Sequence, residues 1–370
     1  MVVRQEPAVP FVPPRCPNTG CPHHRNPTSR FFKRTGFYRA MCRTEPIPRY
    51  LCCTCRRSFS AQTFKVDYRD HRPHVNARVF ALLTSGVGFR QTSRNVGLSH
   101  VSVLRKAMKL GRSLGELHRN LMQGLQTGLT YVLDEEETYE TSPLRPLTVP
   151  YLLEHQTWFV VATDVEPIRR LARRGSSRRD RQDRYEQKNG PRPDRSRTAV
   201  RRVLEALRAA TGPGPMSLVS DMKSSYPVVA KAVFGEDLKR HRLVSSRLPR
   251  DSCNPLFAVN LTIEMGRDNI GRLRPHSWLA SKKGDRLRSH LHLYVAFRNY
   301  VRKRFNRDRP HETPAVLLGL LPRQLGYEEA LRWRQDWGMI SGHPLSPAGQ
   351  ETISDRGKFA PAPTANSAGP

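Results

Sequence analysis

Two kinds of apolar pattern alternate along the chain. Apolar residues recur every three or four positions at 75–110 and again at 285–304, which predicts amphipathic helices. The segment 156–162 has the β-branched and aromatic residues typical of a buried strand, and further strands are expected at 129–133, 217–221 and 242–245. Helices are expected at 226–234 and from Asn254 to Arg272, where Asn and Pro suit a helix start. The alternation of strands and helices predicts an α/β fold.

The net charge of the chain predicts the kind of partner that it binds. Among 370 residues, Lys and Arg number 63 and Asp and Glu 32, so the net charge is +31. Such an excess is self-repelling without a polyanion, and nucleic acid is expected ahead of an anionic membrane. The alternative is a GC-rich genome that simply favours arginine. No membrane span is expected, and the N-terminus lacks a signal-peptide core, which together favour the cytoplasm and association with the nucleoid.

The helical stretch 75–110 divides into three parts. Gly86 and Gly88 end the first helix, Gly97 suits a left-handed turn after the second, and Ser99 suits the N-cap of the third. This predicts a helix-turn-helix that presents polar side chains to the DNA major groove. An ordinary three-helix packing unit with a solvated basic face is the alternative. The predicted DNA contacts are Arg90, Gln91, His100, Ser102, Arg105, Lys106 and Lys109.

Six of the seven cysteines lie between residues 16 and 55. Cys16 and Cys21 form one closely spaced pair, and Cys52 and Cys55 form a second. Two such pairs suit a structural zinc ion with four thiolate ligands, and the sequence around the second pair resembles the closing turn of a zinc ribbon. A redox or fortuitous cluster is the alternative. Substitute ligands left open are His23, His24, Cys42 and Cys53, and Cys253 has no assigned role.

Acidic residues are scarce, and several follow predicted strands. Asp134 opens an acidic run after 129–133, and Asp221 ends the strand 217–221. Glu264 and Asp268 lie four residues apart on one face of a predicted helix. Carboxylates held by a sheet can share the metal ions of two-metal phosphoryl transfer, whereas one carboxylate alone binds Mg²⁺ weakly. Their order along the strands and helices is that of a ribonuclease-H-like nuclease core.

With these motifs, the chain resembles DDE-type bacterial insertion-sequence transposases of the insertion-sequence-one-like group. The resemblance spans roughly residues 16–305. It is carried by the second cysteine pair with Ser58 and Phe59, the helix-turn-helix around 90–97, and the stretches 133–139, 219–221, 260–272 and 278–282.

The resemblance implies metal-dependent DNA strand cleavage and transfer, with Mg²⁺ or Mn²⁺ in a two-metal site. Asp134 and Asp221 would be the first two catalytic ligands and Glu264 the third, while Asp268 and Asn260 stay open as alternatives to Glu264. The expected partner is double-stranded DNA, at the element ends and the target, bound by a homo-oligomer. Further phosphate contacts are expected at Arg267, Arg272 and Arg274.

The predicted domains follow the motifs. They are a zinc ribbon at 1–65, an all-α helix-turn-helix at 66–115, a ribonuclease-H-like catalytic domain at 116–310 and a C-terminal extension at 311–370. Residues 169–202 carry a strong basic excess and are expected to be a mobile insertion that contacts the DNA backbone or, equally, a solvated loop. The tail from about 343 is expected to be disordered.

Two other functions fit the same residues. A zinc-ribbon and helix-turn-helix protein derived from a transposase would act as a DNA-binding regulator without catalysis. A cellular nuclease such as a resolvase would use the same carboxylates and read the shape of a DNA junction. Metal-dependent cleavage separates the first from a transposase, and inverted repeats beside the gene separate the second.

Overall fold

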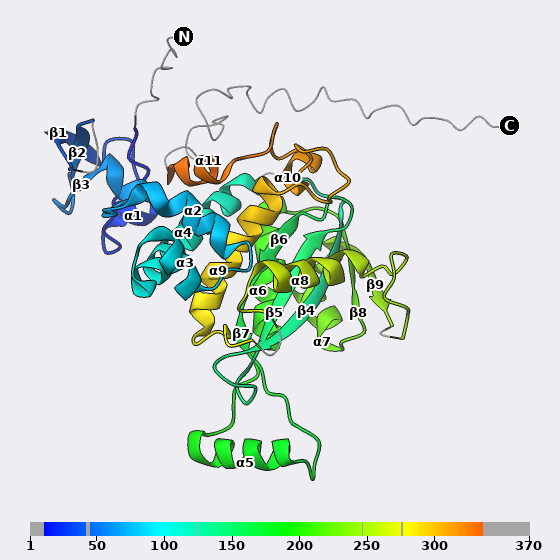
Figure 1. Cartoon of the computed structure of the whole chain (residues 1–370). Coiled ribbons are helices and arrows are strands. Elements are labelled where there is room, and N and C mark those ends of the chain that lie inside the picture. The colour runs from blue at the N-terminus through cyan, green and yellow to red at the C-terminus, as the bar shows by residue number, and fades with distance from the viewer. Residues whose placement is uncertain (1–10, 42–44, 124, 246, 275–276, 336–370) are drawn as a thin grey trace. The chain divides into compact units, whose positions relative to one another are not determined.

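The computed structural model describes residues 11–41, 45–123, 125–245, 247–274 and 277–335 (Figure 1). Its chain divides into two compact units, Met1–His71 with Arg332–Pro370, and Arg72–Leu331. The three-helix segment and the strands that follow it therefore belong to one unit. The tail predicted to be disordered lies outside the described residues, as does Cys42.

The smaller unit contains a three-stranded antiparallel sheet in the order β1 (Phe32–Tyr38), β2 (Ile47–Cys52) and β3 (Ser58–Ser60). A short helix, α1 (Pro22–Arg25), and a 3-10 turn, η1 (Ala61–Phe64), flank the sheet in sequence. Its core is aromatic. The rings of Phe31 and Phe59 stack with centroids 6.4 Å apart, and Tyr50 lies 5.7 Å from Phe59. The cysteines of both pairs pack against this aromatic core.

The larger unit is built on a mixed sheet with the strand order β6-β5-β4-β8-β9, and β7 also pairs with β5. The central strand β4 runs antiparallel to β5 and parallel to β8, which runs parallel to β9. The α/β class is thereby confirmed. The strands are β4 (Thr130–Tyr139), β5 (Pro146–Glu154), β6 (Val160–Thr163), β7 (Glu166–Pro167), β8 (Met216–Asp221) and β9 (Leu238–Val244).

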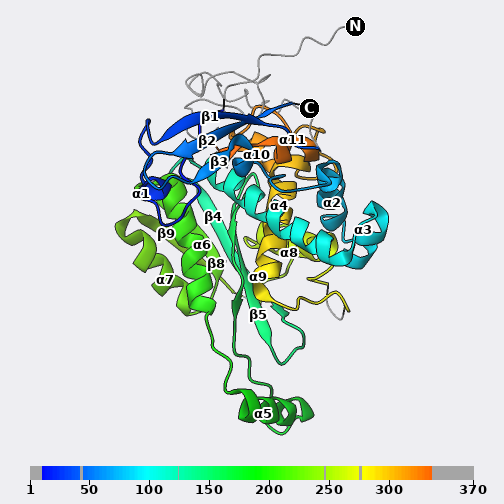
Figure 2. The ribbon, with the colours of Figure 1, turned by 90° about the vertical axis from the view of Figure 1, so that its left-hand side faces the viewer.

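Helices cover both faces of this sheet. Figure 2 shows α6 (Ser196–Thr211) and α7 (Ser225–Phe234) on one side of the strands and α8 (Phe257–Asn269) and α9 (Gly284–Ala296) on the other. The apolar stripe predicted at 285–304 lies buried in α9 and in the π-helical turn η4 (Phe297–Val301) that continues it. The predicted helix at 226–234 is confirmed as α7.

Three strand predictions were wrong in extent, and β5 and β7 of the larger unit were not predicted. The strand expected at 242–245 runs from Leu238 to Val244. The acidic run does not follow β4 but lies within it, because β5 pairs with β4 from Tyr131 to Tyr139. The segment 156–162 forms a strand only from Val160. Pro150 made β5 hard to predict, because proline has no backbone N–H to donate to the hydrogen bonds of a sheet. In the structure, β6 pairs with residues 151–153 and β7 with residues 147–148, so Pro150 lies between the two partners.

The three predicted helices are confirmed as α2 (Asn76–Leu83), α3 (Phe89–Val96) and α4 (His100–Leu121). Gly97 takes the left-handed conformation, with φ 63°, and the hydroxyl of Ser99 accepts a hydrogen bond from the backbone N–H of Ser102 at 3.2 Å. At 22 residues, α4 is far longer than a recognition helix requires. The extra length packs α4 against α9.

Contacts between α4 and α9 join the three-helix segment to the sheet. A Cβ atom on Gly111 would lie 2.2 Å from the carbonyl oxygen of Ser289, so only glycine fits this approach. Farther along α4, the buried His118 donates from Nε2 to the carbonyl of Val161 at 2.8 Å and accepts at Nδ1 from the hydroxyl of Tyr300 at 2.6 Å. A carbonyl oxygen can only accept a hydrogen bond, so the proton of the neutral His118 ring is on Nε2.

The basic segment 169–202 contains a helix, α5 (Ser177–Asn189), and the first residues of α6. Figure 1 shows α5 at the end of two long connecting segments, away from the body of the sheet. The expectation of a segment without regular structure was wrong here, because local contacts stabilise a helix without apolar burial. The hydroxyl of Ser176 caps α5, Arg179 pairs with Asp183 one turn later, and Glu186 accepts two hydrogen bonds from Arg169.

Two short helices follow η4, namely α10 (Pro314–Leu317) and α11 (Tyr327–Arg332). The ring of Tyr327 stacks on Phe297 and meets Phe80 of α2 edge-on, so the end of this unit returns to the three-helix segment. Within the described ranges, no helix combines the length and apolar character needed to cross a membrane.

The close approach at Gly111 predicts an unusual response to alanine. Gly→Ala inside a helix normally stabilises by about 0.5–1 kcal/mol. Gly111→Ala should instead destabilise the protein by roughly 1–3 kcal/mol, because α4 and α9 must separate to admit the methyl group. Urea unfolding monitored by far-UV circular dichroism measures the change, with the exposed neighbour Arg112→Ala as control. An increase in stability for Gly111→Ala would contradict the packing.

Candidate functional site

The four predicted zinc cysteines lie together. The sulfur atoms of Cys16, Cys21, Cys52 and Cys55 are all within 4.8 Å of one another, with Cys16 and Cys55 at 3.5 Å and Cys21 and Cys52 at 3.8 Å. Zn–S bonds of about 2.3 Å in a tetrahedron place sulfur atoms roughly 3.8 Å apart. The spacing therefore fits a metal ion such as zinc.

Tight backbone turns position each cysteine pair. The N–H of Cys21 donates to the carbonyl of Asn18, and the N–H of Cys52 donates to the carbonyl of Arg57, both at 3.0 Å. Burial raises the pKa of Cys16 to about 12. Burial also opposes ionisation of Cys55, but a backbone hydrogen bond from Arg57 and further hydrogen bonds outweigh it and lower that pKa to about 6. A bound cation would ionise all four thiols, and four protein ligands would leave no open position for catalysis.

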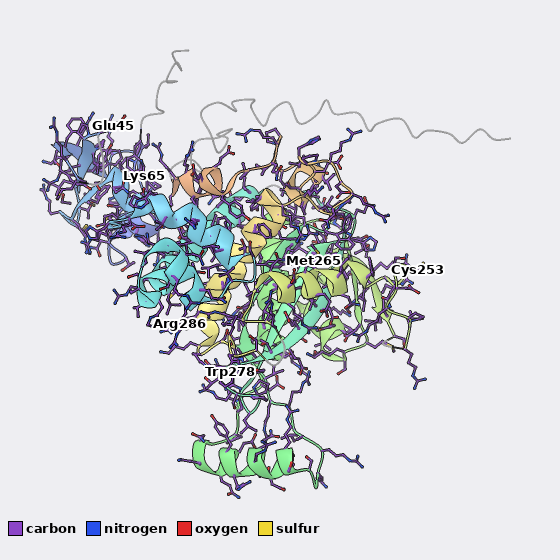
Figure 3. All side chains as sticks on the ribbon, in the orientation of Figure 1. Glu45, Lys65, Cys253, Met265, Trp278 and Arg286 are labelled. Atoms are coloured by element: carbon purple, nitrogen blue, oxygen red, sulfur yellow. The ribbon has the colours of Figure 1, made fainter. Side chains whose placement is uncertain are left out.

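The substitute ligands are placed elsewhere. Cys53 is exposed, and its backbone N–H donates to Phe31. His23 contacts the hydroxyl of Thr54, and His24 contacts the carbonyl of Cys16. Cys253 is exposed in the larger unit (Figure 3).

Serine variants test the cysteine cluster. Cys52→Ser should remove most of the zinc, since a ligand and its negative charge are lost, whereas the adjacent Cys53→Ser should keep about one zinc per chain. Metal content is measured by atomic absorption after purification from zinc-supplemented medium. Equal zinc content in the two variants would exclude the cluster as the binding site.

The sheet brings Asp134 and Asp221 side by side. Leu133 of β4 pairs with Ser220 of β8 in parallel register, so the next residues, Asp134 and Asp221, are neighbours on adjacent strands. The backbone N–H of Glu135 donates to Asp134 at 2.7 Å, and that of Lys223 donates to Asp221 at 2.9 Å.

The negative charges of Asp134 and Asp221 influence one another. Burial raises the pKa of Asp134 to about 6; the backbone N–H of Glu135 opposes this shift, and the negative charge of Asp221 adds to it. Two carboxylates on neighbouring strands supply the hard oxygen ligands that Mg²⁺ or Mn²⁺ prefers. Asp134 and Asp221 therefore supply two ligands of the type such an ion takes, and no third metal-ligating side chain joins them among the described residues.

On the opposite face of β4, Glu135 forms a buried ion pair with Lys223. The Glu135 side chain is only 6 % exposed. Burial opposes its ionisation, but the hydrogen bond and charge of Lys223 outweigh burial and lower the pKa of Glu135. Three hydroxyls also donate to this carboxylate, from Thr148 and Ser196 at 2.8 Å and from Tyr226 at 2.9 Å. These contacts join β4 and β5 to α6 and α7.

Glu264, the predicted third ligand, takes part in a different contact. Arg267 donates to Glu264 at 2.6 Å and to the buried Glu136 of β4 at 2.9 Å. Burial raises the pKa of Glu136 to about 7, although Arg267 favours its ionised form. Arg267, expected to contact DNA, thus bridges two acids and holds α8 against β4.

The three predicted catalytic carboxylates do not converge into one ligand set. Over the residues that the structure describes, the cysteines form the one group of three or more metal-ligating side chains within 4.8 Å. The Glu264 side chain is 61 % exposed and pairs with Arg267, which links it to Glu136 of β4. Asp268 is 83 % exposed and pairs with Arg274 at 3.7 Å. Asn260 lies one turn before Glu264 and remains an alternative.

The prediction for Lys106 was wrong. Its side chain is 9 % exposed, and its ammonium donates to the carbonyl of Arg72 at 2.9 Å and to Asn76 at 2.7 Å. Lys106 therefore joins α4 to the start of α2 and is not free to contact DNA. Sequence periodicity missed this because a long lysine stem reaches across a helix interface.

Other predicted DNA contacts differ in their surroundings. Arg90, His100 and Arg105 are exposed on α3 and α4, and Lys109 is half-buried on α4. Gln91 accepts a hydrogen bond from the N–H of Gly88, and Ser102 accepts one from the hydroxyl of Ser99.

The two arginines after α8 also have protein partners. The guanidinium of Arg272 lies 4.4 Å from the ring centre of Phe89, and burial lowers its pKa to about 10. Arg274 donates to the carbonyl of Asp268 at 2.9 Å. The partly buried Arg272 is a poor candidate for a backbone phosphate contact.

The roles of Glu135, Glu136 and Lys223 were not predicted from the sequence. A signal was available, because neighbours along a strand alternate between faces. An uninterrupted acidic run inside a strand must therefore place carboxylates on both faces, where at least one needs a basic partner.

The chain matches no protein-family model.

Loss of the Lys223 ammonium should destabilise the larger unit. Lys223→Met leaves the buried Glu135 unpaired, at a cost on the order of 3 kcal/mol in unfolding free energy. The exposed Lys231→Met on α7 should change stability little. Denaturant midpoints of the two variants give the comparison. Equal midpoints for the two variants would mean that the Glu135–Lys223 ion pair does not stabilise the larger unit.

Proposed function

We propose that the chain is a DNA transposase of the DDE type, which binds the ends of an insertion element and catalyses metal-dependent strand cleavage and transfer. The observation that carries this proposal is the placement of Asp134 and Asp221 on neighbouring parallel strands at the centre of the sheet. The strand and helix order around them agrees with the expected ribonuclease-H-like core.

The two aspartates would hold Mg²⁺ or Mn²⁺, which supplies charge stabilisation for attacking and leaving oxygens in phosphoryl transfer. Their backbone hydrogen bonds fix each carboxylate relative to its own strand. The Glu135–Lys223 pair fixes the two strands relative to one another from the opposite face. The rigid sheet thus limits the movement of the ligands, which catalysis requires.

Glu264 is proposed as the third ligand. Arg267 links it to Glu136 of β4, and release from Arg267 would free the carboxylate. Asp268, paired outward with Arg274, has less support. Arg267 is proposed to position the two glutamates it bridges.

The remaining segments are proposed to bind DNA. The cysteine cluster and the three-stranded sheet would form a zinc ribbon, with zinc as its scaffold. The exposed residues Arg90, His100 and Arg105 of the three-helix segment would contact the element ends. The net charge of +31 supports a polyanionic partner.

Aspartate variants test catalysis. Asp134→Asn and Asp221→Asn should each reduce cleavage at least about 10³-fold, because several kcal/mol of transition-state stabilisation are lost. The substrate is a plasmid carrying the DNA that flanks the gene, incubated with Mg²⁺ or Mn²⁺ and analysed on a denaturing gel. DNA binding, measured in parallel, should persist.

The matched control is Glu236→Gln. Glu236 is an exposed acid before β9, at the opposite end of the parallel strands from Asp221. Full cleavage by Asp134→Asn would refute the proposed site. In the same assay, Glu264→Gln, Asp268→Asn and Asn260→Ala identify the third ligand by which of them loses activity.

A DNA-binding regulator without catalysis is the second candidate. The observation that favours it is the engagement of Glu264 with Arg267, which leaves the two aspartates without a third carboxylate at ligand distance in the described part of the chain. Under this function, wild-type protein binds the flanking DNA and does not cut it with either metal.

A further inference from the structure

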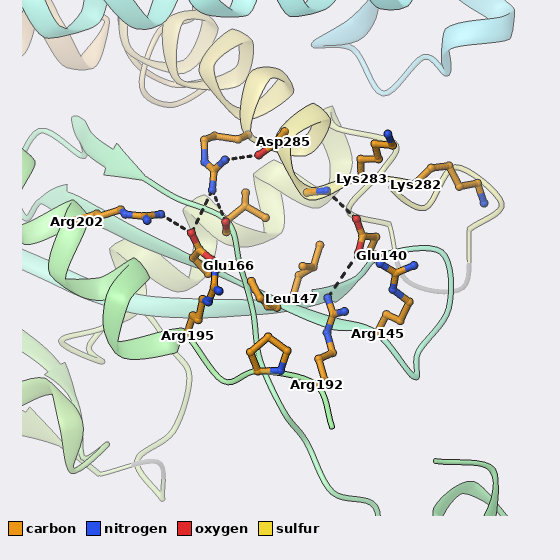
Figure 4. A pocket seen from close by; sticks show the side chains of 15 residues that line it. Glu140, Arg145, Leu147, Glu166, Arg192, Arg195, Arg202, Lys282, Lys283 and Asp285 are labelled. Atoms are coloured by element: carbon orange, nitrogen blue, oxygen red, sulfur yellow. Dashed lines mark hydrogen bonds and ion pairs between the residues drawn. The ribbon is translucent and has the colours of Figure 1, made fainter. Parts of the chain in front are cut away.

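A basic pocket of about 610 Å³ lies outside the carboxylate site, between the start of β5, the start of α6 and the start of α9 (Figure 4). Seven basic and three acidic residues line it. The acidic Glu166 is satisfied within the protein, since Arg202 and Arg288 both pair with it. The positive charge of the pocket therefore exceeds what its own acids neutralise.

One carboxylate in this pocket is held as a bound anion would be. Glu140 accepts a hydrogen bond from the backbone N–H of Gly284, at the start of α9, at 3.1 Å. Arg145 donates to the same carboxylate at 2.6 Å, and Arg192 lies 3.7 Å from it. A helix N-terminus together with guanidinium groups is an arrangement that binds phosphate oxygens.

Further positive charge surrounds this carboxylate. Lys282 and Lys283 are exposed, and neither forms an ion pair with any residue that the structure describes. Figure 4 shows both lysines on the same side of the pocket as Glu140. Burial lowers the pKa of Arg192; the charge of Glu140 opposes this shift, while that of Arg145 adds to it. One carboxylate thus leaves the cluster with uncompensated positive charge.

A row of basic residues extends from the pocket. The arm that carries α5 begins and ends at its edge, through Pro167 and Arg192. Arginines exposed along the arm and unpaired with any described acid are Arg173, Arg174, Arg178, Arg181 and Arg184. A charged track much longer than the pocket suits an extended polyanion better than a small anion.

We propose that this pocket binds a backbone phosphate of double-stranded DNA, with the α5 arm along the same duplex. Glu140 occupies the phosphate position in the free protein. It lies six residues beyond Asp134, or roughly 20 Å along a strand. The contacted phosphate would then lie about six base pairs from the scissile one. The distance between the contacted and the scissile phosphate rests on the proposed cleavage function, whereas binding of a DNA phosphate in the pocket does not.

The test is a binding titration in which cleavage plays no part. A fluorescent random-sequence duplex of about 30 base pairs, the length of a typical protein site on DNA, is titrated with Asp134→Asn protein. The titration contains no added divalent metal and is repeated at several NaCl concentrations. Adding Lys282→Gln and Lys283→Gln should weaken binding and reduce the slope of log affinity against log salt by about 2.

The matched control is the double substitution Lys231→Gln and Lys239→Gln, which removes the same charge from exposed positions on α7 and β9. Equal loss of affinity in both double variants would overturn the proposal that the pocket binds DNA, since the change in net charge alone would explain the loss. A small-anion site would also overturn it. In that case the lysine variant would bind inorganic phosphate more weakly than the parent protein but would bind the duplex with the same affinity and the same salt dependence.

A third variant gives an effect of opposite sign. In Glu140→Gln the amide oxygen can still accept the Gly284 N–H, but the competing negative charge is gone. Duplex affinity should rise at least about threefold at low salt. Unchanged or weaker binding by a variant that keeps the wild-type melting temperature would contradict the role of Glu140. Because every arm measures binding, failure here is distinct from failure of the cleavage assay.

Discussion

The buried ion pair between Glu135 and Lys223 is the contact on which the carboxylate site depends. Glu135 is adjacent in sequence to Asp134, and Lys223 lies two residues after Asp221. Neighbouring residues of a strand face opposite sides of a sheet, so a contact on the face covered by α6 and α7 constrains the carboxylates on the other. Desolvation makes an unpaired buried charge costly, which resists relative movement of β4 and β8.

The opposite face of β4 uses the same alternation with a different partner. Glu136 is buried under α8 and meets Arg267, which also binds Glu264. Arg267 therefore couples the position of α8 to the strand that carries Asp134. In a chain with this basic excess, Glu135 and Glu136 each pair with a specific base, whereas Asp134 and Asp221 form no ion pair with any residue that the structure describes.

The three-helix segment is an integral part of the sheet unit. His118 of α4 contacts both β6 and η4, and the imidazole of His290 on α9 contacts the carbonyl of Leu83 at the end of α2. The turn between α2 and α3 reaches α8 as well, where the N–H of Gly86 donates to the carbonyl of Asn269 at 2.8 Å. A ligand on α3 or α4 would therefore act on the same rigid body that holds the carboxylates.

The sequence by itself determined the elements whose signals are local. Gly97 and Ser99 marked helix boundaries through turn and cap chemistry, the paired cysteine spacing indicated a cluster, and the strand-like run after a Gly/Pro turn indicated β8. These signals depend on a few neighbouring residues. Only the tertiary structure decided which polar side chains are buried and which acids meet. Lys106, Arg267 and Glu135 find partners 30 to 131 residues away, and such pairings depend on how the sheet and its helices pack.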